Sequence, residues 1–137
     1  MDAKTRHLII KNEVEELTKL PEFVDTVCED AGVNMALIAS LNLALEEAVT
    51  NVVLYAYPDR EGTVDINAVY TEKYLKFIIT DSGIAFDPTK KEDADITLSA
   101  EARPIGGLGI YLVRQIMDSV NYKRMKGRNI LTIIKNL

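Results

Sequence analysis

The sequence predicts one α+β domain, a two-layer sandwich in which about three helices cover one face of a mixed, mainly antiparallel sheet. Three observations support this fold class. The hydrophobic period switches several times between helical and strand spacing. Two pairs of alternating segments are separated by short turns, which predicts two hairpins. The length of 137 residues, with no repeat or linker, suits a single core, so we expect one domain over 1–137.

Composition narrows the class of protein. Apolar residues make up 47% of the chain, enough for a core, which argues against a disordered protein. The net charge of -5 argues against a protein that mainly coats nucleic acid or an anionic membrane. The single cysteine, Cys28, cannot form an internal disulfide, and no secretory pattern or uninterrupted apolar run of roughly 18 residues is present. We therefore expect a cytoplasmic domain.

The first half of the chain predicts a short strand and two helices. The apolar run at 8–10 predicts an edge strand. Asn12 is a plausible cap for a helix with apolar residues at helical spacing up to Val27, and Gly32 would end it. A longer helix is predicted from Asn34 to about residue 57, because its apolar residues form one stripe.

The second half predicts a hairpin, a long connection, a helix and another hairpin. Their ranges are 64–70 and 75–80 for the first hairpin, about 81–109 for the connection, 108–120 for the helix, and 121–124 with 130–134 for the second hairpin. The order is therefore β-α-α-β-β-loop-α-β-β. The connection contains several glycines and a charged centre, and a loop of this length within a domain is usually functional.

The first candidate site lies on the second helix. Glu47 and Asn51 are four residues apart, so they lie one turn from each other on the same face, whereas Glu46 projects toward solvent. A carboxylate and an amide oxygen in this arrangement could hold a hard cation and activate a hydroxyl group. The alternative is an ordinary surface pair with no catalytic role.

The second and third candidates are an acidic strand end and a glycine cluster. Asp81, followed by Gly83, could offer its carboxylate to an amino group while the backbone approaches a flat ring; the alternative is a strand-ending turn. The glycines of 106–109 open the third predicted helix, where bare N–H groups can bind an anion. The alternative there is a flexible loop, and neither a Walker sequence nor a Rossmann fingerprint is present.

In this order, Glu-x-x-x-Asn on a helix, Asp-x-Gly after a strand and Gly-x-Gly at a helix start resemble three motifs of the GHKL (Bergerat-fold) ATPases. The resemblance covers about residues 5–135. It is closest to the anti-sigma-factor serine/threonine kinases of the RsbW and SpoIIAB type, in segments 45–51, 81–88 and 106–113. It implies the histidine-kinase ATPase fold, with an ATP lid at about 86–104.

The resemblance also implies a role for each matching residue. Glu47 matches the general base that acts on the acceptor hydroxyl. Asn51 matches the Mg²⁺ ligand, Asp81 the acceptor of the adenine amino group, and Gly83 the glycine beneath adenine. The residues that match the phosphate-binding part of the site are Arg103, Gly107, Leu108 and Gly109.

The sequence departs from the family pattern in two places. Ala85 stands where many relatives carry a second glycine, which predicts a stiffer hinge because alanine is less free in φ. The run 127–129, Gly-Arg-Asn, stands where Gly-Thr is frequent.

The resemblance implies a partner-switching kinase. Such a protein uses Mg·ATP to phosphorylate a serine or threonine of a STAS-type anti-sigma-factor antagonist, and it binds and inhibits a sigma factor. A homodimer is also implied. One alternative is a non-catalytic regulatory module that keeps the nucleotide pocket; the presence of Glu47 favours the enzyme. Another is an ATP-hydrolysing fragment of a larger machine.

Overall fold

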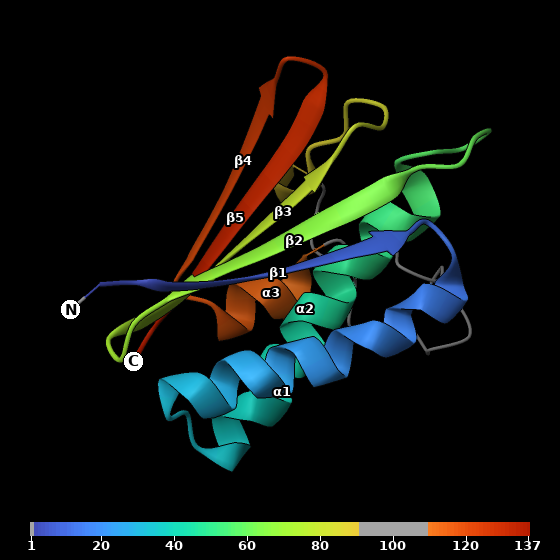
Figure 1. Ribbon diagram of the computed structural model, residues 1–137. Helices are drawn as coiled ribbons and strands as arrows, with labels where there is room; N and C mark the ends of the chain where they lie inside the picture. Colours follow the sequence, from blue (N-terminus) through green and yellow to red (C-terminus); the bar gives the residue numbers. More distant parts are fainter. Residues whose placement is uncertain (1, 91–109) are drawn as a thin grey trace, which may run out of the picture.

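A five-stranded sheet forms the upper layer of the computed structural model, which describes residues 2–90 and 110–137 (Figure 1). The strand order is β1-β2-β3-β5-β4, and each of the four described pairings is antiparallel. The strands are β1 (Lys4–Lys11), β2 (Thr63–Tyr70), β3 (Tyr74–Asp81), β4 (Ser119–Met125) and β5 (Arg128–Asn136).

The helices lie on one face of this sheet (Figure 1). They are the 3-10 helix η1 (Val14–Lys19), α1 (Leu20–Ala31), α2 (Met35–Tyr55), the 3-10 turn η2 (Pro88–Lys90) and α3 (Tyr111–Ile116). The predicted fold class and the order of the main elements are therefore confirmed. The sheet was expected to be mixed, and its described pairings are instead all antiparallel.

Local sequence signals set the ends of two helices. The Asn34 side chain accepts a hydrogen bond of 2.9 Å from the N–H of Leu37, so it caps α2 as predicted. Gly32 ends α1 in the left-handed region with φ of 75°, a conformation that costs glycine little.

The predicted start of the first helix is wrong. Asn12 does not cap it; its side chain instead accepts from the N–H of Gly62 and donates to the carbonyl of Arg60. The segment after it is a 3-10 helix, and the α-helix starts only at Leu20, with Pro21 in its first turn. Proline has no N–H, so this position suits it.

The predicted third helix is too long at its C-terminal end. Val120 was expected on that helix but lies in β4, opposite Ile133 of β5. The helix ends at Ile116, since Met117 has extended backbone angles and the N–H of Asp118 already donates to Ile134. Pairing with the sheet outweighs the local helical pattern here.

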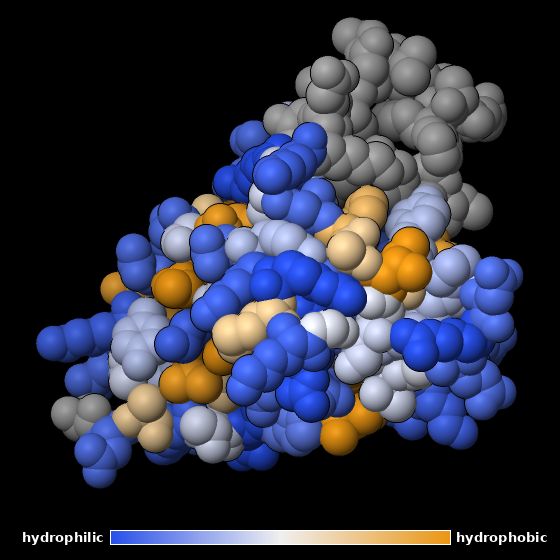
Figure 2. Space-filling view, turned by 90° about the horizontal axis from the view of Figure 1, so that it is seen from above, coloured by the Kyte–Doolittle hydropathy of each residue, from blue (hydrophilic) through white to orange (hydrophobic). Residues whose placement is uncertain are grey.

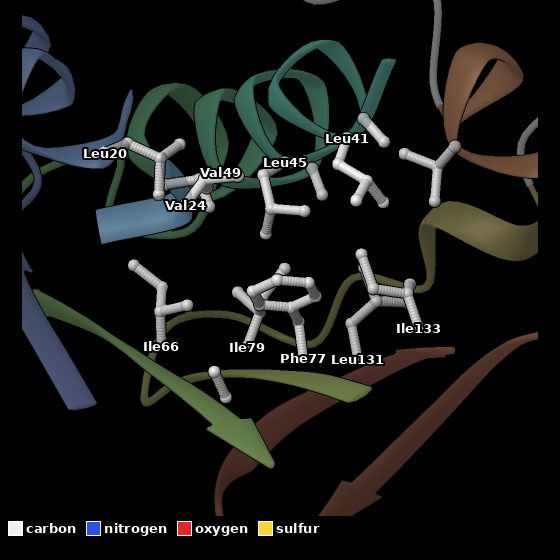
Figure 3. Packing of buried hydrophobic residues seen from close by; sticks show 14 of the residues in the cluster. Leu20, Val24, Leu41, Leu45, Val49, Ile66, Phe77, Ile79, Leu131 and Ile133 are labelled. Atoms are coloured by element: carbon white, nitrogen blue, oxygen red, sulfur yellow. The ribbon is translucent and has the colours of Figure 1, made fainter. Parts of the chain in front are cut away.

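The core lies between the two layers. In Figure 3, Leu41, Leu45 and Val49 point from the helical layer toward Phe77 and Ile133 of the sheet. The alternation of β2 and β3 sends every second side chain into this core, as the sequence pattern predicts. Cys28 is also buried, and burial raises the pKa of its thiol to about 11.

Helix α2 is the central element of the helical layer. Its 21 residues are long and apolar enough to cross a membrane by length and composition alone, and core helices of soluble proteins pass the same test. Here its apolar side chains pack on the sheet. Seen from above, the surface is largely hydrophilic, with hydrophobic residues in separate patches (Figure 2).

Phe77 tests the assignment of the two sheet faces. Its ring is fully buried beneath α2, whereas the next residue, Ile78, lies half-buried on the opposite face. Phe77→Ala should lower the free energy of unfolding by about 3–5 kcal/mol because it leaves a cavity, and Ile78→Ala should cost markedly less. Urea unfolding monitored by circular dichroism measures both. Equal losses would contradict the described packing.

Candidate functional site

Three buried polar residues define the candidate site. Within the described part of the chain, the buried polar or charged residues are Asn51, Asp81 and Asn129, each at most 5% exposed. They come from α2, β3 and β5, yet all three line one small cavity. Polar side chains that converge on a mostly apolar cavity are typical of ligand sites, so this cavity is the candidate site.

Among the described residues that line this cavity, Asp81 is the one with a carboxylate. Its Oδ1 accepts hydrogen bonds of 2.9 Å from the N–H of Gly83 and 2.9 Å from the side-chain amide of Asn129. Among the described residues, no hydrogen bond reaches the other oxygen, Oδ2. Burial raises the pKa of the Asp81 carboxyl, and the bonds from Asn129 and Gly83 oppose this rise. A carboxylate oxygen is therefore available to accept from a ligand.

Gly83 allows the chain after β3 to lie directly on the end of α2. A Cβ at this position would stand 2.1 Å from the carbonyl oxygen of Ala56, closer than any real contact. The next residue, Ile84, donates a hydrogen bond of 2.9 Å to the same carbonyl. A glycine is therefore required here by close backbone approach.

Residues 86–88 form one side of the cavity. Phe86 and Pro88 line it, and the ring of Phe86 lies 6.3 Å from that of Tyr55 on α2, measured between centroids. Asp87 fixes the turn that follows, because its Oδ1 accepts from the N–H of Thr89 at 2.9 Å. These groups and the aliphatic lining residues give the cavity apolar walls suited to a flat ring.

Of the predicted pair on α2, Asn51 lies at the cavity and Glu47 lies outside its lining. Asn51 lines the cavity, while Glu47, one turn earlier, is half-buried and accepts a 2.9 Å hydrogen bond through Oε2 from the N–H of Leu112 in α3. Glu46 is exposed to solvent. The difference between the two glutamates therefore agrees with the helical geometry expected from the sequence. Their catalytic roles stay predictions.

Sequence reasoning missed Asn129 and its neighbours Tyr122 and Arg124. The Asn129 side chain bonds both of these residues as well as Asp81. The only sequence signal was the departure from the family pattern at 127–129. The importance of Asn129 follows from strand register, because it pairs directly with Asp81 across β5 and β3.

Four predicted site residues lie outside the described part of the chain. They are Arg103, Gly107, Leu108 and Gly109, and most of the predicted lid at 86–104 lies outside it too. Within residues 2–90 and 110–137, no group of three or more His, Cys, Asp or Glu side chains is placed to hold a metal ion.

The fold and site define a class: a one-sheet α+β domain with a cavity between the longest helix of its described part and the sheet. Residues 10–135 match the family model described as the histidine kinase-like ATPase domain. The chain belongs to this family, so the resemblance seen in the sequence is confirmed.

Within this family, the chain is similar to several proteins named serine-protein kinase RsbW. The chain is 32% identical over 124 residues to the serine-protein kinase RsbW of Listeria monocytogenes, an alignment that covers 87% of this chain and 78% of the relative. It is also 32% identical over 98 residues to proteins of the same name from Bacillus cereus and Bacillus anthracis. Those alignments cover 69% of this chain and only 61% of the Bacillus proteins.

Asp81→Asn should make the ligand-free protein more stable at pH 7. Burial raises the pKa of Asp81 above its ordinary value of 3.8, so the folded state holds the proton more tightly than the unfolded chain. The ionised carboxylate therefore lowers stability above the folded pKa, and this cost fades as the pH falls through that pKa toward 3.8. Asparagine does not ionise.

Urea unfolding of wild type and Asp81→Asn at pH 7 and pH 4.5 measures this difference. We expect the variant's advantage to shrink at the lower pH. Asp65→Asn, on the outward face of β2, is the matched control and should show no such advantage. A variant less stable than wild type at pH 7 would show that Asp81 stabilises the ligand-free fold.

Proposed function

We propose that this protein is an ATP-dependent serine/threonine kinase of a partner-switching module. It phosphorylates a STAS-type anti-sigma-factor antagonist, and it binds and inhibits a sigma factor. Family membership and the similarity to proteins named serine-protein kinase RsbW support this proposal. The structural observation that carries it is the convergence of Asn51, Asp81 and Asn129, the buried polar residues of the described chain, on one cavity.

ATP fits the chemistry of this cavity through its base. The Oδ2 of Asp81 has acceptor capacity for the amino group of adenine. Gly83 lets the chain after β3 lie against the end of α2, and its N–H donates to Oδ1 of Asp81, which leaves Oδ2 for the base. Arg103, Gly107, Leu108 and Gly109 would contact the phosphates, which stays a prediction from the sequence.

Magnesium would be held by the side-chain oxygen of Asn51 together with the nucleotide phosphates. Mg²⁺ prefers oxygen ligands and commonly takes only one or two from the protein, so a single amide oxygen beside the phosphates is a suitable donor. When bound, the ion neutralises charge that develops on the phosphate oxygens. Asn51 is buried at the cavity, which supports this assignment.

Glu47 would act as the general base toward the acceptor hydroxyl. The N–H of Leu112 holds Oε2 of its carboxylate at 2.9 Å, which fixes the side chain beside the start of α3. A carboxylate held in this way is oriented before the acceptor arrives, and positioning accounts for much of phosphoryl-transfer catalysis. Exposed Glu46 lacks this support.

The proposed partners are proteins. An acidic chain of net charge -5 suits basic patches on a partner and disfavours direct contact with nucleic acid or an anionic membrane. We propose a cytoplasmic protein of bacterial transcription regulation that acts as a homodimer. The similarity to the RsbW proteins supports this setting.

Glu47→Gln tests the proposed reaction. Wild type, incubated with labelled Mg·ATP and a STAS-domain protein encoded in the same genome, should transfer label to that protein. Glutamine keeps the shape of the side chain and an oxygen that can accept from Leu112, but it cannot take a proton. Transfer should therefore fall by roughly 10²-fold or more while ATP binding is retained.

Glu46→Gln is the matched control, because it changes the adjacent carboxylate, which faces solvent. It should transfer label almost as well as wild type. Equal losses in the two variants would remove Glu47 from its role as base. Nucleotide binding by wild type with no transfer would replace the kinase by a non-catalytic regulatory module.

A further inference from the structure

The buried side-chain amide of Asn129 is fully hydrogen-bonded within the described chain. Five groups contact its amide: the N–H of Phe86, the hydroxyl of Tyr122 and the guanidinium of Arg124 on Oδ1, and the carboxylate of Asp81 and the carbonyl of Ile84 on Nδ2. Every hydrogen-bonding position of the amide is used.

These partners allow one orientation of the amide. The N–H of Phe86, at 3.3 Å, and Arg124, at 3.1 Å, can only donate, so they require the oxygen. The carbonyl of Ile84, at 2.7 Å, can only accept, so it requires the NH₂ group. The NH₂ group is therefore held toward Asp81, at 2.9 Å from Oδ1.

With the amide in this orientation, the two carboxylate oxygens of Asp81 have different roles. Oδ1 accepts from both Asn129 and Gly83, so its acceptor capacity is used by the protein itself. Oδ2 accepts nothing from the described residues, and it belongs to a residue that is only 5% exposed and lines the cavity. A donor on Oδ1 also favours the ionised carboxylate, which can accept but cannot donate.

An acceptor without a proton discriminates strongly between ring substituents. An exocyclic amino group can donate to it, whereas a carbonyl oxygen at the same place would face it as a second acceptor. A buried site built for one hydrogen bond rejects the analogue that lacks the donor, because its polar atom is then left unpaired.

We propose that Asn129 is the positioning residue that sets base selectivity, holding Asp81 so that the cavity takes 6-amino purines and rejects 6-oxo purines. Asn129 acts through Asp81, which would contact the base. The register of the sheet supports this role, because Asp81 and Asn129 are direct cross-strand partners on neighbouring strands. The inference rests on the proposed function, since it requires that the cavity bind the base of a nucleotide.

The test compares ATP with ITP, which differ in the 6-amino and 6-oxo groups. Calorimetric titration of Mg·ATP and Mg·ITP gives the ratio of their affinities for each variant. Wild type should prefer ATP by at least about tenfold, the value of one hydrogen bond to a charged group. Asn129→Ala should lower this preference by about tenfold, because Asp81 loses its orientation and a stabilising donor.

Asn129→Leu is a second variant of similar volume. It leaves no cavity of the size that alanine leaves, but it removes the NH₂ group that donates to Oδ1 of Asp81. It should lose the preference for ATP as Asn129→Ala does. This variant keeps the test decisive even where the alanine variant does not fold.

Two controls separate positioning from general support. Tyr122→Phe removes one donor on the oxygen side of the amide and leaves the donation to Asp81, so the ATP-to-ITP ratio should stay near the wild-type value. Asn121→Ala removes an exposed asparagine on the opposite face of the same hairpin and should change neither affinity.

The outcomes separate the two proposals. A wild-type protein that binds neither nucleotide would overturn the proposed function itself. A wild type that prefers ATP, with both Asn129 variants keeping that preference while binding both nucleotides more weakly, would overturn the inference and leave Asn129 a structural residue. Loss of the preference in both Asn129 variants, with the controls unchanged, is the expected result.

Discussion

The burial of one carboxylate, that of Asp81, is the constraint on which the rest of the site depends. An ionised group out of water must be met by hydrogen bonds or it destabilises the fold. Here the N–H of Gly83 and the amide of Asn129 both meet the same oxygen. The chain after β3 is held against Ala56, and Asn129 is locked by its other partners. Much of the local structure therefore positions the donors that stabilise the Asp81 carboxylate.

This constraint explains why the protein tolerates a costly group. Burial raises the pKa of Asp81, which means that the ligand-free fold binds a proton at this carboxylate more tightly than the unfolded chain does. A ligand donor that reaches Oδ2 would stabilise the ionised carboxylate. The free energy that burial costs the ligand-free protein would then favour ligands that carry such a donor. Stability and recognition are opposed at this position, as is common in functional sites.

The sequence predicted most of the fold because its signals are local. The alternation in β2 and β3 and the cap at Asn34 depend on neighbouring residues, and the structure agrees with them. The predictions failed where distant contacts decide. Asn12 reads as a cap in isolation but bonds the 60–62 turn, and Val120 fits a helical stripe but joins the sheet.

The same distinction between local and distant signals applies to the residues of the candidate site. The spacing of Glu47 and Asn51, and the Asp81–Gly83 pair, can be found from short segments, and the structure places Asn51, Asp81 and Gly83 at or beside one cavity with Glu47 one turn away. Asn129 could not be found this way. It is 48 residues from Asp81 in sequence, and only the pairing of β3 with β5 brings the two together.

A crystal structure of the protein with Mg²⁺ and a non-hydrolysable ATP analogue tests the central claim most directly. We predict the adenine amino group on Oδ2 of Asp81, with Oδ1 still bound to Gly83 and Asn129. The magnesium ion should contact the Asn51 side chain. Base density elsewhere, such as the open groove between β1 and α1 lined by Arg6 and Phe23, with Oδ2 of Asp81 left unbound, would contradict the account.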